Sequence, residues 1–139
     1  MKRKLFLVAF IVLPFFLIGC SDHVRLSGQV TYSDDGAPLE TGRVLFEPES
    51  GSFHARGTIG TDGRYTLATH KPGDGLPPGK YRVYLEDTSR WETPPGAERS
   101  VEMPLIESKY NYPDSSGLVL DVNRSTRKFD FQVDRATKK

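Results

Sequence analysis

The chain has 139 residues, with 19 Lys+Arg against 18 Asp+Glu and a single cysteine. This length suits one domain with a hydrophobic core of its own. The lone cysteine excludes an intramolecular disulfide and makes a poor metal site. The balanced charge, with no basic patch beyond the Lys138-Lys139 tail, argues against nucleic acid as a partner.

The first 20 residues have the pattern of a bacterial secretion signal. A basic start at residues 1–4 is followed by 14 apolar residues, 5–18, and then by Gly19 and Cys20. The apolar run is too short to cross a bilayer as a helix, which takes about 20 residues. The pattern therefore predicts a cleaved signal. Two alternatives remain: an ordinary signal peptide with a coincidental cysteine, and a transmembrane anchor, which Pro14 disfavours.

The end of this signal resembles the bacterial lipobox, in which small or apolar residues precede Gly-Cys. In proteins with that motif the cysteine thiol receives diacylglycerol, the preceding peptide is cleaved and the new amino terminus is acylated. The resemblance implies lipid on Cys20, and two or more acyl chains hold a protein durably on a membrane. Ser21, where inner-membrane lipoproteins tend to have Asp, favours the outer membrane of the cell envelope. Cleavage before Cys20 leaves 120 residues with 16 Lys+Arg and 18 Asp+Glu.

The rest of the chain alternates between apolar and polar residues in short runs separated by Gly and Pro, and it has no sustained helical periodicity. Seven strands are predicted, at residues 24–32, 42–48, 54–60, 64–69, 80–87, 117–122 and 128–133. Gly28 falls on the apolar face of the first strand, where a missing side chain often marks a bulge or close packing.

The connections predict how these strands are paired. Asp62-Gly63 is typical of a hairpin tip and joins the third strand to the fourth. The last two strands are predicted to form a second hairpin, and residues 88–104 to be the longest irregular stretch. Seven short strands at regular spacing predict an all-β fold, a single antiparallel Ig-like or transthyretin-like β-sandwich.

Several turn and strand motifs resemble those of carboxypeptidase regulatory-like domains. They lie at residues 26–31, 36–39, 42–46, 60–67 and 76–83. These domains are transthyretin-like sandwiches that include small envelope lipoproteins of planctomycete-type bacteria. The resemblance covers residues 24–133 and implies a fold more than an activity, since the family has no catalytic residues to transfer. We expect a signal peptide at 1–19, a lipidated tether at 20–23, the sandwich at 24–134 and a basic tail at 135–139.

Residues that could carry chemistry are few. His54 and His70 meet if the hairpin register centres on Asp62-Gly63, which leaves a two-histidine metal site open beside the commoner explanation of paired surface histidines. Ser115-Ser116-Gly117 is not a nucleophile elbow. Asp34-Asp35-Gly36 and Asp74-Gly75 lack a calcium-loop pattern and are explained as turns. We therefore expect no catalytic residue, no metal and no cofactor.

Three aromatic residues in predicted loops are the candidate contacts for a ligand or partner: Trp91, Tyr110 and Tyr112. Aromatic rings beside polar groups stack on sugars or anchor protein interfaces. The alternative is that Trp91 and Tyr110 fold back to plug open ends of the sandwich. The sequence thus favours a non-enzymatic, membrane-anchored envelope lipoprotein that contacts protein or glycan. The alternative function is a carbohydrate-binding module, and the oligomeric state stays undecided.

Overall fold

The computed structural model describes residues 22–50 and 54–137, so the predicted signal peptide and Cys20 lie outside the described residues. Within the described part, no helix is long and apolar enough to cross a membrane. The elements there are β1 (Ser27–Tyr32), β2 (Arg43–Pro48), β3 (Ala55–Thr58), β4 (Arg64–Thr66), β5 (Gly79–Glu86), β6 (Ser89–Glu92), β7 (Val101–Pro104), the 3-10 helix η1 (Ser108–Asn111), β8 (Leu118–Val122) and β9 (Phe131–Val133).

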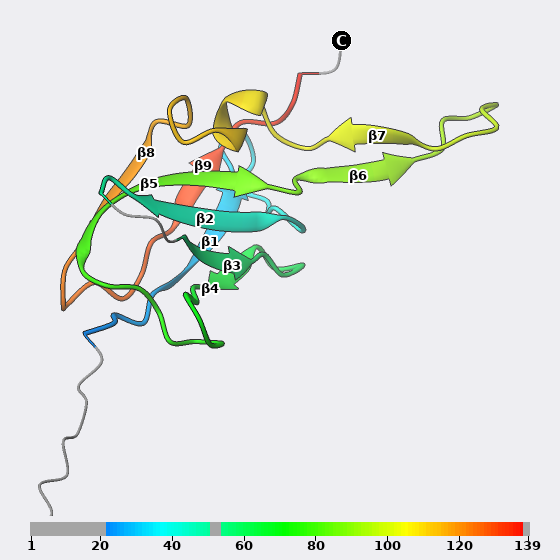
Figure 1. Ribbon diagram of the computed structural model, residues 1–139. Helices are drawn as coiled ribbons and strands as arrows, with labels where there is room; N and C mark the ends of the chain where they lie inside the picture. Colours follow the sequence, from blue (N-terminus) through cyan, green and yellow to red (C-terminus); the bar gives the residue numbers. More distant parts are fainter. Residues whose placement is uncertain (1–21, 51–53, 138–139) are drawn as a thin grey trace, which may run out of the picture.

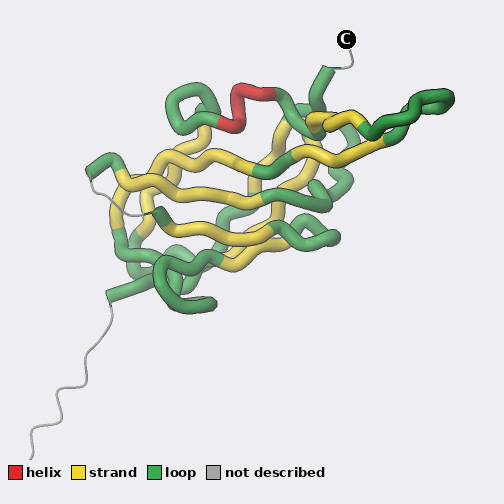
Figure 2. The backbone as a smooth tube through the Cα atoms, turned by 45° about the vertical axis from the view of Figure 1, so that its right-hand side comes forward, coloured by secondary structure: helices red, strands yellow, loops and turns green. Residues whose placement is uncertain are grey.

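Two sheets pack face to face, and a separate two-stranded ribbon extends from them (Figures 1 and 2). One sheet has the order β4-β1-β9 and the other β3-β2-β5-β8, while β6 and β7 pair only with each other among the described strands. The predicted all-β sandwich is therefore confirmed. It is not wholly antiparallel, because β9 runs parallel to β1.

The alternation of apolar side chains explains which face of each strand is buried. In β5, Tyr81, Val83 and Leu85 point between the sheets, and the residues between them are partly or fully exposed. Phe46 of β2 lies near the centre of this core. Its ring centroid is 6.0 Å from that of Tyr81 and 6.0 Å from that of Phe129, so one side chain connects both sheets.

Gly28 marks a close approach of two backbones, as the sequence predicted. A Cβ atom at this position would lie 1.8 Å from the carbonyl oxygen of Phe129, a distance that only glycine permits. The hydroxyl of Tyr65 donates a hydrogen bond of 2.6 Å to the same carbonyl. One backbone group of the segment before β9 is thus fixed by two features of the β1–β4 pair.

The predicted hairpin around Asp62-Gly63 forms, but its two strands belong to different sheets. The amides of Arg56 and Ala68 bond each other's carbonyls at 3.0 and 2.9 Å, so the strands remain linked where they separate. Gly63 has a φ of 77°, which a tip of this kind requires.

The predicted last hairpin is wrong. β8 pairs antiparallel with β5 in the four-stranded sheet, whereas β9 pairs parallel with β1 in the other sheet. Residues 123–130 cross from one layer to the other. Alternation shows which face of a strand is buried, but it does not show which strand lies next to it, and this is why the pairing was missed.

Two residues that were expected in the tail also pair with the sandwich. Arg135 pairs with Ile106, and the amide of Ala136 donates to the carbonyl of Leu105 at 3.2 Å. At the other end of the chain, Val24 and Leu76 exchange backbone hydrogen bonds of 2.7 and 3.1 Å. Both ends of the described chain are therefore held against the sandwich.

Candidate functional site

The stretch predicted to be irregular, residues 88–104, instead forms a two-stranded antiparallel ribbon. β6 and β7 pair from Ser89 with Pro104 to Glu92 with Val101. Figures 1 and 2 show the ribbon extending beyond the sandwich at the end opposite to residues 22–26. The prediction failed because each strand has only four residues, too few to show a sustained alternation, and neither strand buries a residue in a core.

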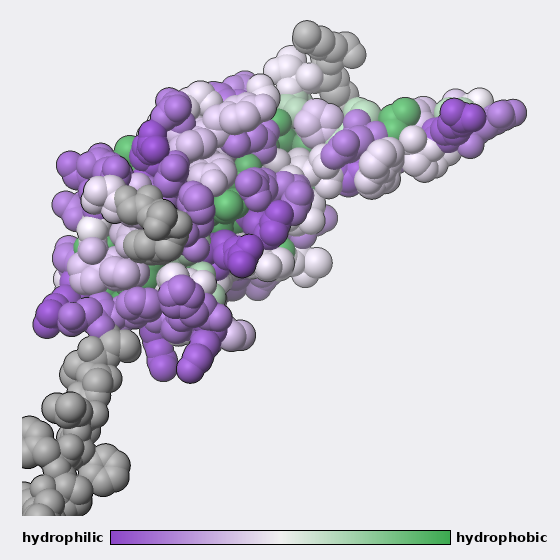
Figure 3. Space-filling view, in the orientation of Figure 1, coloured by the Kyte–Doolittle hydropathy of each residue, from purple (hydrophilic) through white to green (hydrophobic). Residues whose placement is uncertain are grey.

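Trp91 is displayed to solvent at the middle of the ribbon. Its side chain is 70% exposed, and no residue of either strand is buried. Val101 on β7 is 43% exposed. The face of the molecule in Figure 3 is mainly hydrophilic, with small and separate apolar areas. Trp91 therefore does not plug the sandwich, and it remains a candidate contact residue.

Local polar contacts hold the ribbon in shape. Ser89 donates a hydrogen bond to Glu102, and Arg90 pairs with Glu92 along β6. At the connection, the hydroxyls of Thr93 and Ser100 lie 2.8 Å apart. The ribbon is thus stabilised by its own backbone ladder and short-range contacts, with no hydrophobic core.

The base of the ribbon is fixed to the sandwich by backbone and amide hydrogen bonds. Thr88 is buried, and its carbonyl accepts from the amide of Leu105 at 2.9 Å. The side-chain amide of Asn111 donates to the carbonyl of Leu85 at 2.9 Å and to the hydroxyl of Thr88 at 3.2 Å. The direction in which the ribbon leaves the sandwich is therefore set by well-bonded residues.

Tyr110 belongs to a polar cluster beside this base and not to the exposed surface. It is only 7% exposed, and its hydroxyl donates to the Asp134 carboxylate at 2.9 Å. Lys109 and Ser33 donate to the same carboxylate at 2.7 and 2.6 Å. These donors, Lys109 first, favour the charged form and lower the pKa of Asp134 to about 2. Tyr110 therefore packs against this end of the sandwich, as the alternative expected, and offers little surface to a ligand or partner.

Arg135 closes the same end of the sandwich. Its guanidinium lies 3.6 Å from the centre of the Tyr32 ring and donates to Asp34 and Asp35, each at 2.8 Å. Asp74 is occupied in a similar way, because backbone amides of residues 69–71 donate to it and lower its pKa to about 2. These turn carboxylates, which suggested a calcium alternative, are held by donors of the chain.

Tyr112 is 64% exposed, in the segment that follows η1, outside the ribbon. The three predicted contact residues therefore do not form one aromatic platform. Two of them are exposed on different segments and the third is buried.

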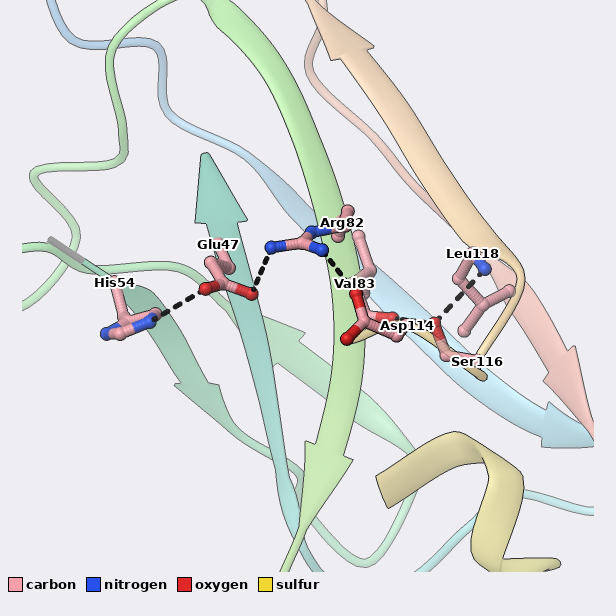
Figure 4. A network of polar contacts seen from close by, with 7 residues as sticks. All are labelled: Glu47, His54, Arg82, Val83, Asp114, Ser116 and Leu118. Carbon is pink, nitrogen blue, oxygen red and sulfur yellow. Dashed lines mark hydrogen bonds and ion pairs between the residues drawn. The ribbon is translucent and has the colours of Figure 1, made fainter. Parts of the chain in front are cut away.

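The row of polar residues in Figure 4 includes the histidine and serine that could suggest catalysis. His54 lies 4.0 Å from Glu47, and Arg82 pairs with Glu47 at 3.1 Å and with Asp114. Figure 4 shows His54 and Ser116 at opposite ends of this row. The buried Ser116 hydroxyl donates to the carbonyl of Val83 at 2.6 Å, a structural role.

The two histidines of the metal alternative have different surroundings. His54 contacts Glu47, whereas the His70 amide belongs to the loop bonded to Asp74. In the described ranges there is no group of three or more His, Cys, Asp or Glu residues that could hold a metal ion.

No protein-family model matches the chain, and no curated protein is similar to it in sequence. Among solved structures, a variant of BcpA, the major pilin subunit of Bacillus cereus, is similar with a TM-score of 0.53 and 9% identity over 83% of this chain. BcpA itself gives a TM-score of 0.49 and 10% identity over 82% of this chain. The chain spans 30% of each pilin's length. The likeness to the variant shows a shared all-β sandwich fold.

Proposed function

We propose that this chain is a non-enzymatic, lipid-anchored protein of the cell envelope whose sandwich holds the β6–β7 ribbon out for contact with a partner protein. The observation that carries the proposal is Trp91, 70% exposed on a ribbon without a buried residue. A sandwich fold shared with a pilin subunit is compatible with a structural or interaction role.

The ribbon has two properties that suit a protein interface. Tryptophan is enriched among the residues that dominate binding energy, because it buries a large rigid surface. In addition, β6 and β7 have no other strand beside them within the described chain, so each has an outer edge at which an extended segment can add. A carbohydrate-binding role has less support, because Tyr110 is buried and Tyr112 lies outside the ribbon.

The anchoring part of the proposal is supported by the sequence. Cys20 follows a short apolar run and a glycine, four residues before Val24, which is fixed to the sandwich. Mass spectrometry of the mature protein should find acylated Cys20 at the amino terminus, and Cys20→Ser should release the protein from membranes. A mature protein that begins elsewhere would contradict the anchor.

The contact role is tested by affinity capture of the lipidated protein from native membranes after brief crosslinking. We expect Trp91→Ala to lose at least one partner that the unchanged protein recovers. Tyr112→Ala is the matched control, because it removes another largely exposed aromatic ring, outside the ribbon. The proposal fails if both variants recover the same proteins as the unchanged chain, or if only the Tyr112 variant loses one.

A further inference from the structure

The two ends of the sandwich differ in charge. We call the end near Val24 the tether end; it comprises residues 22–28, 48–50, 70–80 and 121–128. These segments are joined by three backbone pairings: Val24 with Leu76, Gly79 with Val122 and Pro48 with Tyr81. The ribbon end comprises residues 33–43, 60–64, 86–107 and 134–135. The tether end has six Lys+Arg and four Asp+Glu, whereas the ribbon end has five and eleven.

Several cations of the tether end are available to a partner. Arg25, Lys71 and Lys80 are exposed and form no ion pair with another described residue. Two of the four acids there are already occupied. Asp22 pairs with Arg124 at 3.0 Å, and Asp74 accepts three backbone amides. These contacts leave the net charge of this end unchanged, and Lys128 pairs with Asp130 just outside it. Arg25, Lys71 and Lys80 are therefore exposed cations of this end that can meet an anionic partner.

The attachment point places this end next to a membrane. Cys20 precedes Val24 by four residues, a reach of at most about 14 Å for an extended chain. Val24 is itself held by its two hydrogen bonds to Leu76. Across the sandwich, β5 runs from the tether end at Gly79 to the ribbon end at Glu86, about 23 Å. That distance exceeds two Debye lengths of about 8 Å at physiological salt, so the two ends experience a charged surface differently.

We propose that the tether end docks on anionic phospholipid headgroups, with Arg25, Lys71 and Lys80 against lipid phosphates, and that the acidic ribbon end is held away from the membrane. The inference rests on lipid attachment at Cys20. Both charged ends favour the same orientation, because an anionic surface attracts the basic tether end and repels the acidic ribbon end. Docking then points the ribbon, with Trp91, toward partners beyond the membrane surface (Figure 1).

Lysine labelling of the mature lipidated protein tests this orientation. The protein is reconstituted into vesicles of phosphatidylcholine alone or with an equal part of phosphatidylglycerol, acetylated briefly and digested for mass spectrometry. Lys71 and Lys80 should label about fivefold more slowly with phosphatidylglycerol, and the difference should disappear near 1 M salt. Lys109, beside the ribbon base, is the internal control and should label equally in both lipids. Equal labelling of Lys71 and Lys80 in both lipids would overturn the inference.

Charge-reversal variants separate docking from anchoring. Arg25→Glu with Lys71→Glu should restore the labelling of Lys80 in phosphatidylglycerol vesicles, while Arg99→Glu on the ribbon connection should leave its protection unchanged. These positions are exposed, and circular dichroism checks that the variants fold. Protein that fails to float with phosphatidylcholine vesicles contradicts the lipid anchor itself. Protein that floats with both lipids but shows no selective protection contradicts only the docking.

Discussion

β5 and β6 follow each other in the chain, yet they have opposite relations to the core. In β5 every second residue from Tyr81 to Leu85 is buried, whereas none is buried in β6. β5 lies between two partner strands, while β6 has only β7 beside it. Two-stranded ribbons are at best marginally stable alone. The difference shows that the sandwich carries the stability of the protein, and that the ribbon is an appendage held at its base.

The largest expected effect comes from truncating the side chain that joins the two sheets. Phe46→Ala removes a fully buried ring that contacts Tyr81 and Phe129, and should lower the free energy of unfolding by about 3–5 kcal/mol. Val101→Ala on the ribbon should stay within about 0.5 kcal/mol. Urea denaturation measures both. Similar losses for the two variants would mean that the ribbon shares the core's role.

A smaller effect is expected for Tyr65→Phe. The Tyr65 hydroxyl is buried and donates to the Phe129 carbonyl at 2.6 Å, so the variant leaves that carbonyl without this donor. The loss should be about 1–2 kcal/mol in urea denaturation at neutral pH. The matched change in an exposed tyrosine, Tyr112→Phe, should have no measurable effect.

The Tyr65 hydroxyl also makes the stability difference between the unchanged protein and Tyr65→Phe depend on pH. Burial, with Asp130 nearby, raises the pKa of Tyr65 in the folded protein, while the unfolded chain releases this proton near pH 10. The contribution of Tyr65 to stability is therefore complete below about pH 10 and declines as the pH rises further. The difference in the free energy of unfolding between the unchanged protein and Tyr65→Phe should narrow as the pH rises above about 10. A gap that widens would contradict this sign.

The sandwich strands could be predicted because alternation and turn residues are local signals. β5 alternates without interruption, and Asp62-Gly63 identifies a hairpin tip. The ribbon gives no such signal, since Ser89–Glu92 is exposed on both faces. The parallel pairing of β9 with β1 depends on contacts about 100 residues apart in the chain, such as Val30 with Phe131. No local pattern specifies such a partner.

The sequence identified the aromatic candidate residues by their type, but it did not show which of them are exposed and which are buried. Trp91 was found as an aromatic residue in a polar segment, and the structure exposes it. Tyr110 had the same appearance in the sequence, but it is buried, and its hydroxyl donates to Asp134, which lies 24 residues away. Distinguishing the two required the position of the last segment, which the sequence alone placed in the wrong hairpin.

The smallest expected effect is also the sharpest test of the difference between sandwich and ribbon. Residues 90–103 are replaced by Asn-Gly, which joins Ser89 to Pro104 through a two-residue turn. These two residues are already paired in the ribbon, and the new turn matches their antiparallel geometry. Because no side chain of β6 or β7 is buried, the free energy of unfolding should change by less than about 1 kcal/mol.

Calorimetry of this shortened protein, compared with a control that keeps the ribbon and changes Trp91→Ala, distinguishes the two roles of the segment. Equal melting temperatures with loss of the captured partner in both variants would show that the ribbon acts in binding and contributes nothing to folding. A loss above about 2 kcal/mol in the shortened protein alone would indicate that the Thr88 and Asn111 contacts at the base need the ribbon to form. In that case the ribbon would contribute to the stability of the fold, and β5 and β6 would differ only in how exposed their residues are.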